Sequence, residues 1–273
     1  MIPIALTIAG SDCSAGAGLQ ADLKTFQHFR SYGLTAATCV VAETPTTVLS
    51  IHPVPPAILQ DQVKLLLDSY PIAAIKTGML FSKAHVVAVS EIISKHPTIP
   101  LVVDPVMVAS SGESLLKKDA VEAYIDRLLP LATLITPNLD EAEVLIGHPV
   151  RDEDAIEKAA RALSLLFKTS ILLKGGHLNT PECADLLDQQ DTFKWFRSPR
   201  IDTPASHGTG CTLSAAIAAR LAHGDDLATA VGHAKSYLSR TLSEALTLGK
   251  LNHLNQGTSF THSTRDPQAS LDS

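Results

Sequence analysis

One glycine-rich stretch of the chain combines residue types that can hold an anion and accept a proton. It reads Ser206-His-Gly-Thr-Gly-Cys-Thr-Leu-Ser214 and runs directly into an apolar helical pattern. Converging backbone N–H groups and the positive end of the following helix favour negative charge in such a turn. Cys211 falls in the first helical turn, where the same dipole favours the thiolate over the thiol. The stretch therefore predicts an anion hole with a base beside it, and a packing loop with a buried cysteine is the alternative.

Other polar residues stand just beyond the ends of short apolar, β-branched runs. Because the carboxyl ends of parallel strands meet at one edge of a sheet, where open α/β proteins bind ligands, we expect these side chains to lie together. Taken singly, each also fits a turn former or a helix cap. The set comprises Asp12, Glu43, Asp104, Asn138, Glu141 and Lys174.

Four members of this set suggest a site for magnesium and phosphate. Asp104, Asn138 and Glu141 offer the oxygen ligands that hydrated Mg²⁺ prefers. Asn138 fits equally well as the N-cap of a helix, with Glu141 as its capping-box partner. Lys174 ends the run Ile-Leu-Leu-Lys, where it either meets a phosphate as a point charge or extends its ammonium group into solvent.

The elements that must position these residues alternate regularly between strands and helices. This alternation predicts an α/β fold with a mostly parallel central sheet and helices on both faces. Between about residues 183 and 204 the rhythm changes to a short antiparallel excursion, and Pro45 is expected to end regular structure after the second strand. Strands are expected at 2–9, 33–42, 73–78, 101–105, 133–137 and 171–174, and helices at 19–29, 56–67, 83–94, 118–129, from 140, 152–167, 211–223 and 227–245.

The chain is expected to form one domain. Its 273 residues are enough to bury a substantial core, and no linker interrupts the first 245 of them. From Lys250 the sequence becomes polar and aperiodic. We therefore predict a domain over residues 1–249 and a mobile tail over 250–273.

Composition argues against several classes of partner. The formal net charge is −6 and basic residues are dispersed, which argues against nucleic acid or an anionic membrane as the main partner. The four cysteines show no CxxC spacing, so we expect reduced thiols in a cytoplasmic protein. No basic leader precedes the first apolar run, which ends at Ser11-Asp12, so we expect neither a signal peptide nor a membrane-spanning helix.

A dinucleotide-binding oxidoreductase is an alternative of another class. Gly16-Ala-Gly-Leu-Gln-Ala21 fits a relaxed Rossmann fingerprint, and Glu43 ends the second strand roughly twenty residues on, as that motif expects. Against it, residues 10–15 lengthen a turn that should be tight, and residues 207–214 are left without a role. A P-loop is excluded because the chain contains no Gly-x-x-x-x-Gly-Lys-Ser/Thr.

Co-linear motifs accompany the glycine-rich stretch along the chain to about residue 246. They are Leu6-Thr-Ile-Ala-Gly-Ser-Asp12, Gly16-Ala-Gly-Leu-Gln-Ala-Asp-Leu-Lys-Thr-Phe26, Lys76-Thr-Gly-Met-Leu80, Val103-Asp-Pro-Val-Met107, Leu134-Ile-Thr-Pro-Asn138 and Leu173-Lys-Gly-Gly-His177. With them the sequence resembles the hydroxymethylpyrimidine/phosphomethylpyrimidine kinases of thiamine biosynthesis, members of the ribokinase-like superfamily. The resemblance implies a three-layer ribokinase-like fold, ATP- and Mg²⁺-dependent phosphorylation of a pyrimidine hydroxymethyl group and then of the monophosphate, and a homodimer.

The resemblance also implies roles for residues that match the family's motifs. Cys211 takes the place where sugar kinases of the superfamily use aspartate as a base, and Asp104 and Glu141 take the place of the magnesium ligands. The implied catalytic set is Cys211, Gly208, Thr209, Gly210 and Lys174; the nucleotide set is Asn138, Lys174, His207 and Gly208; the pyrimidine pocket is Gly10, Asp22, Glu43, Met79, Val106 and Cys211.

One position departs from the family's pattern. Where the family usually reads Ala-Gln-Asn-Thr, this chain reads Ala42-Glu-Thr-Pro45. An amide that donates and accepts is thereby replaced by a carboxylate that only accepts when ionised. Glu43 fits an aminopyrimidine through its exocyclic amine and a protonated ring nitrogen, and it also fits a changed substrate such as a pyridoxal-like vitamin. A vitamin-binding protein without catalysis is a third alternative.

Overall fold

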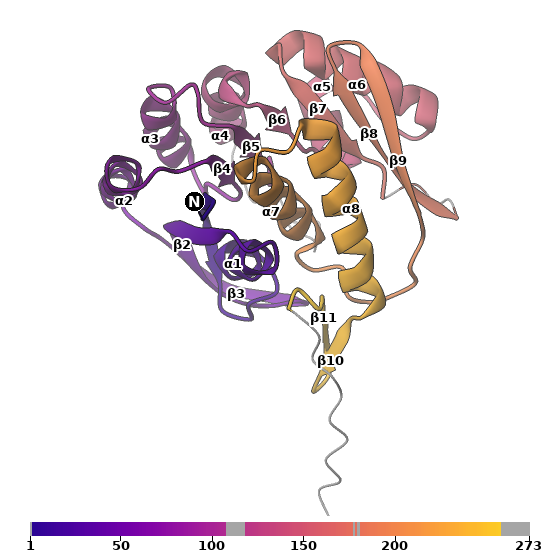
Figure 1. Cartoon of the computed structure of the whole chain (residues 1–273), viewed down its shortest axis with the longest axis horizontal. Coiled ribbons are helices and arrows are strands. Elements are labelled where there is room, and N and C mark those ends of the chain that lie inside the picture. The colour runs from indigo at the N-terminus through magenta and orange to yellow at the C-terminus, as the bar shows by residue number, and fades with distance from the viewer. Residues whose placement is uncertain (1, 108–117, 177, 179–180, 258–273) are drawn as a thin grey trace, which may run out of the picture.

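A nine-stranded mixed sheet forms the centre of the molecule, with helices packed on both of its faces (Figure 1). This computed structural model describes residues 2–107, 118–176, 178 and 181–257. The sheet order is β3-β2-β1-β4-β5-β6-β7-β8-β9. Strands β2, β1, β4, β5, β6 and β7 run parallel, and β3, β8 and β9 add antiparallel strands at the two edges. The predicted parallel sheet and its antiparallel excursion are confirmed.

The bounds of the elements follow the predicted alternation closely. The strands are β1 (Ile4–Asp12), β2 (Tyr32–Thr44), β3 (Thr47–Pro53), β4 (Ala74–Thr77), β5 (Leu101–Val103), β6 (Leu134–Ile135), β7 (Ser170–Lys174), β8 (Glu182–Gln189), β9 (Thr192–Pro199), β10 (Leu246–Leu248) and β11 (Leu251–His253). The helices are α1 (Gly18–His28), α2 (Pro56–Ser69), α3 (Lys83–Ile93), α4 (Lys118–Ala123), α5 (Leu139–Ile146), α6 (Glu153–Phe167), α7 (Thr209–Ala222) and α8 (Leu227–Ser243). A π-helical segment (Tyr124–Leu128) and a short 3-10 helix (Leu129–Leu131) continue α4.

Two apolar cores lie on opposite faces of the sheet. One core gathers side chains of α2 to α6, and the other packs α7 and α8 with Phe26 of α1. Strands in the middle of the sheet contribute to both, because alternate side chains point to opposite faces. Leu6 and Ile8 of β1 join the first core and Ala5 joins the second. This three-layer arrangement places the carboxyl ends of the parallel strands along one edge.

The hairpin formed by β2 and β3 was not predicted. After Thr44 the chain turns and returns antiparallel, with Val41 opposite Ile51. Strand β3 lies at the sheet edge and is mostly exposed, and Leu49 is 83% exposed. Its side chains therefore do not show the apolar pattern that marks a buried strand.

The predicted domain boundary at residue 249 is wrong. Strands β10 and β11 form a hairpin, and Leu254, Asn255 and Gln256 after it are 4%, 4% and 2% exposed. The hydroxyl of Tyr237 in α8 donates to the carbonyl of Gln256 at 2.8 Å. Asn and Gln read as surface residues in a sequence, yet here both are buried, and Nε2 of Gln256 donates two hydrogen bonds. The remainder of the predicted tail, residues 258–273, lies outside the described residues.

The predicted absence of a spanning segment can be compared with the helices of the structure. Among the helices in the described part of the chain, none has the length and apolar character needed to cross a membrane.

Candidate active site

A cavity of about 590 Å³ opens at the carboxyl ends of the parallel strands. Its walls come from the loops after β1, β4, β5, β6 and β7, from the β2–β3 hairpin and from the start of α7. Every residue in the implied catalytic, nucleotide, metal and pyrimidine sets lines this cavity except Asp22, and Asp12 of the polar set does not line it either. The residues that line it are Gly10, Glu43, Met79, Asp104, Val106, Asn138, Glu141, Lys174, His207, Gly208, Thr209, Gly210 and Cys211.

The start of α7 requires glycine at position 208 and leaves little room for a side chain at position 210. Gly208 has a φ of 82°, and a Cβ there would lie 2.0 Å from the carbonyl oxygen of Gly16. A Cβ at Gly210 would lie 3.3 Å from Nζ of Lys174 and 3.4 Å from Oδ2 of Asp104. The first N–H groups of a helix lack helical acceptors. The turn can therefore bring the positive end of α7 close to an anion in the cavity.

Asp104 and Lys174 form the charged centre of the cavity. Nζ of Lys174 donates to Oδ1 of Asp104 at 3.0 Å, and the hydroxyl of Ser214 donates to Oδ2 at 3.2 Å. Asp104 is 1% exposed. Burial opposes ionisation of Asp104, but the charges of Lys174 and Lys76 hold the pKa of its carboxyl below the usual value. This carboxylate is therefore ionised at neutral pH.

Asn138 and Glu141 form the capping box that the sequence allowed. Oδ1 of Asn138 accepts from the backbone N of Glu141, and Oε2 of Glu141 accepts from the backbone N of Asn138, both at 2.8 Å. Burial, reinforced by the charge of Asp104 and opposed by Lys174, raises the pKa of Glu141 to about 7. Two buried carboxylates thus share one lysine. This donor set fits Mg²⁺, because a divalent cation would compensate the excess negative charge.

The thiol of Cys211 does not have the lowered pKa that the helix dipole predicts. Burial raises the pKa of Cys211 to about 11, against the opposing charge of Lys76. The carboxylates of Asp22 and Asp104 also raise it. Desolvation of the thiolate outweighs the dipole of α7 at this buried position. The expected lowering is wrong, and Cys211 is a protonated thiol at neutral pH.

A family model described as phosphomethylpyrimidine kinase matches residues 12–255 of the chain. The chain belongs to the phosphomethylpyrimidine kinase family. The match begins at Asp12, the last residue of β1, covers the other eight strands of the central sheet and extends past the predicted boundary at residue 249. The protein is therefore a phosphotransferase, and the Rossmann oxidoreductase alternative is wrong.

Named relatives of this kinase act in vitamin metabolism. The chain is 44% identical over 253 residues to the thiamine biosynthesis bifunctional protein ThiED of Geobacter sulfurreducens. The alignment covers 91% of this chain and 52% of that protein, so this chain spans about half the length of that relative. It is 42% identical over 249 residues to the hydroxymethylpyrimidine/phosphomethylpyrimidine kinase of Haemophilus influenzae, covering 90% of this chain and 93% of that one. An ADP complex of Bacillus subtilis pyridoxal kinase superimposes with a TM-score of 0.87 at 35% identity, covering 93% and 97% of the two chains. The ribokinase-like fold and a small-molecule substrate are thereby confirmed.

Asp22 does not line the cavity of this kinase. It is fully buried and accepts from Nζ of Lys76 at 2.7 Å and 3.0 Å and from the hydroxyl of Thr7 at 2.6 Å. The structure therefore gives Asp22 an ion-pair role beneath the cavity, and its expected contact with the pyrimidine stays a prediction. Lys76 was not assigned to the site from the sequence. Its signal was a lysine inside the apolar strand Ala-Ile-Lys-Thr, where a charge needs a buried partner.

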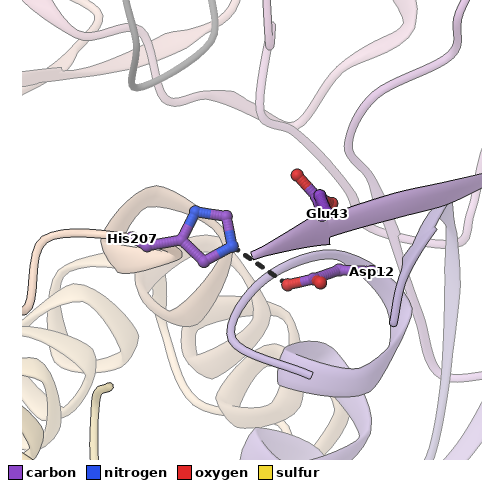
Figure 2. A group of neighbouring side chains, drawn as sticks. All are labelled: Asp12, Glu43 and His207. Atoms are coloured by element: carbon purple, nitrogen blue, oxygen red, sulfur yellow. Dashed lines mark hydrogen bonds and ion pairs between the residues drawn. The ribbon is translucent and has the colours of Figure 1, made fainter. Parts of the chain in front are cut away.

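Asp12 organises the loop between β1 and α1 of the kinase. Oδ2 accepts from the backbone N of Gly16 and of Ala17 at 3.0 Å and 2.8 Å, and from Nε2 of His207 at 3.0 Å. Figure 2 shows Asp12 and His207 joined in this way, with Glu43 beside them. These three residues bring ligand atoms within 4.8 Å of one another, but hydrogen bonds from the loop and His207 account for the Asp12 carboxylate without a metal. Asp12 therefore ties the loop to the start of α7.

The stability of the kinase should depend on pH through Asp12. Burial opposes ionisation, but hydrogen bonds from His207, Ser14 and Ala17 lower the pKa of Asp12 to about 2. Because the folded pKa lies below the unfolded value of about 3.9, the stabilisation is present above that value and is lost as pH falls toward about 2. Asp12→Asn lacks this titration. Urea unfolding from about pH 5 to about pH 2 should therefore show the wild type losing its advantage over Asp12→Asn, and a constant difference would contradict the assignment.

Proposed function

We propose that this kinase transfers the terminal phosphoryl group of ATP to the hydroxymethyl group of 4-amino-5-hydroxymethyl-2-methylpyrimidine. The resulting monophosphate is then phosphorylated to the diphosphate. The observation that carries the proposal is that one cavity joins the glycine turn, the Asp104–Lys174 pair and Glu43 in a chain of this family. Phosphoryl transfer requires mainly positioning and charge stabilisation, which such a cavity supplies.

The nucleotide end of the cavity is built from the turn before α7 and from Lys174. We assign Asn138, Lys174, His207 and Gly208 to the nucleotide phosphates, with the backbone N–H groups of Thr209 and Gly210 facing the group in transfer. Asp104 and Glu141 would hold Mg²⁺, which neutralises developing phosphate charge when bound. Lys174 places a fixed positive charge beside Asp104 and keeps that carboxylate ionised.

Cys211 is assigned as the residue that removes the proton from the attacking hydroxyl. It lines the cavity at the start of α7, next to the glycine turn. Because its pKa is raised to about 11, the thiol must first release its own proton to solvent, and the charge of Lys76 favours that loss. The sulfur is then the proton acceptor, and the reaction should run faster as pH rises.

Glu43, Gly10, Met79 and Val106 line the part of the cavity assigned to the pyrimidine. Burial, with the charge of Asp12, raises the pKa of Glu43, while His207 opposes this. A carboxylate here accepts from the exocyclic amine of the pyrimidine and from a protonated ring nitrogen. Glu43 therefore selects a ring that presents two adjacent donors.

Exchanging Glu43 for glutamine should change how the pyrimidine binds. Glu43→Gln keeps the side-chain shape but replaces one acceptor with a donor, which is unpaired against a ring N–H. We expect KM for the pyrimidine to rise by about tenfold, the effect of losing one charged hydrogen bond, with a smaller change in kcat. Steady-state kinetics with both proteins measure this, and identical KM and selectivity would contradict the role of Glu43.

A pyridoxal-type kinase is the second candidate, favoured by the close superposition on Bacillus subtilis pyridoxal kinase and by the departure at Glu43. The deciding experiment incubates the purified protein with ATP and Mg²⁺ and with hydroxymethylpyrimidine, its monophosphate or pyridoxal in parallel. We expect both pyrimidines to be phosphorylated. Turnover of pyridoxal alone would refute the pyrimidine assignment.

We further propose that the protein is a cytoplasmic homodimer. The resemblance to the family supports the dimer, and four cysteines outside any CxxC pattern, unpaired in the structure, support a reducing compartment. Light scattering after size-exclusion chromatography tests the dimer, since a mass near that of one chain would refute it.

A further inference from the structure

The segment after α8 folds back onto the two loops that enclose the cavity. We call residues 10–18 the first glycine loop and residues 206–212 the anion-hole turn. Gln256 is 2% exposed, and its Nε2 donates to the carbonyl oxygen of Gly16 at 3.0 Å and to the hydroxyl oxygen of Thr212 at 2.9 Å. One side-chain amide therefore joins both loops.

Gln256 acts at a point where the two loops pack closely against each other. The Gly16 carbonyl that accepts from Gln256 is also the atom that a Cβ at Gly208 would meet at 2.0 Å. A carbonyl oxygen only accepts, so the NH₂ group must face it. Displacing this amide would change the spacing between Gly16 and Gly208.

Packing alone does not explain a carboxamide at this position. Within the described residues, Oε1 of Gln256 is buried and has no hydrogen-bond partner. An unsatisfied buried polar atom costs about 1–3 kcal/mol, whereas an apolar side chain of similar size would avoid this cost. The two hydrogen bonds from Nε2 are therefore what the side chain contributes.

The backbone around Gln256 is itself anchored. The hydroxyl of Tyr237 donates to the Gln256 carbonyl at 2.8 Å, and the backbone N of Asn255 donates to the carbonyl of Thr241 at 3.2 Å. Both partners belong to α8. Helix α8 thus holds the backbone of Gln256, and the side-chain amide of Gln256 contacts both loops.

We propose that Gln256 is a positioning residue for phosphoryl transfer, which sets the spacing between the first glycine loop and the anion-hole turn. The proposal rests on the proposed role of the anion-hole turn in binding the transferring phosphoryl group. Gly10 of the first glycine loop and Gly208 to Cys211 of the anion-hole turn line the same cavity, and the proposed function assigns Gly10 to the pyrimidine and Gly208 to Gly210 to the phosphates. A shift between them would misalign the hydroxyl with the phosphoryl group rather than remove a ligand contact.

The test replaces Gln256 by leucine, which keeps the approximate size of the side chain and removes both donors. We expect kcat for the pyrimidine to fall by about tenfold to a hundredfold, the loss produced by misplacement of about 1 Å. KM for the pyrimidine should change by less than about twofold because no ligand contact is removed. Amide hydrogen exchange should become faster in residues 10–18 and 206–212 together.

A second pair of variants tests the same hydrogen bond without placing a leucine at position 256. Thr212→Val removes one acceptor of Gln256, and Thr212→Ser keeps the hydroxyl, so only the valine variant should reproduce the effects of Gln256→Leu. Thr247→Val serves as the matched control. It removes an exposed hydrogen bond of 2.9 Å to Asn252 within the β10–β11 hairpin, which precedes Gln256 in the chain. In this variant kcat and amide exchange in both loops should stay at wild-type values.

Two results would overturn the proposal: unchanged exchange in the two loops of Gln256→Leu, or faster exchange with kcat unchanged. Failure of the proposed function would appear differently, as absence of pyrimidine phosphorylation by the wild type itself. Thermal unfolding of each variant separates loss of folded protein from loss of turnover.

Discussion

Replacing Cys211 by alanine is expected to lower kcat for the pyrimidine by about 10²–10⁴-fold, the contribution of a positioned general base. The variant removes only the sulfur, so the glycine turn and the Asp104–Lys174 pair remain in place. KM should change little because other residues hold the ring and the phosphates. Steady-state kinetics at a fixed pH measure the effect, and turnover at the wild-type rate would eliminate Cys211 as the base.

The pH profile gives an independent signature of the same residue. Burial raises the pKa of Cys211 to about 11, so the reactive thiolate is the minor form near neutrality. Its fraction rises about tenfold per pH unit below the pKa, and the wild-type kcat should therefore climb between about pH 7 and about pH 9. Cys211→Ala should lack this slope. Cys211→Asp supplies a carboxylate base, and we expect partial activity with a flatter profile.

Replacing Lys76 by methionine is expected to lower the free energy of unfolding by about 3–5 kcal/mol, the usual cost of removing one partner of a buried ion pair. Lys76 and Asp22 both have fully buried side chains 2.7 Å apart. Domains of this kind are stable by about 5–15 kcal/mol, so the loss is a large fraction of the total. Urea unfolding of the wild type and of Lys76→Met measures the difference.

The sign of the pH dependence follows from what remains in Lys76→Met. Burial already raises the pKa of Asp22, and without Lys76 the opposing charge is gone. A group whose folded pKa is raised favours the folded state below its unfolded pKa and loses that contribution as pH rises. The deficit of the variant should therefore be smallest below about pH 4 and grow above it.

Two comparisons make the ion-pair prediction specific. Adding Asp22→Asn to Lys76→Met removes the unpaired charge, so the double variant should recover most of the lost stability. Lys158→Met breaks the exposed pair with Asp154 at 2.6 Å and should have little effect. A double variant no more stable than Lys76→Met would contradict the proposed cause.

The sequence alone predicted the layers and the place of the site. Alternating apolar runs and helical patterns predicted the parallel sheet, since strands buried on both faces must be apolar. Because parallel strands end at one edge, the spacing of Asp104, Glu141 and Lys174 along the chain was enough to place them in one cavity. The glycine turn before α7 carried its own signal in its composition.

Features that depend on distant partners were decided only by the tertiary structure. Asp22 meets Lys76 across 54 positions, and Gln256 meets Gly16 across 240, so no local pattern records either contact. The edge strand β3 is exposed and lacks an apolar pattern. For Cys211, the local sequence predicted its place in the first turn of a helix. The pKa of its thiol, in contrast, follows from burial and from charges that folding brings together. Local sequence sets which elements form, whereas desolvation and charge are properties of the assembled interior.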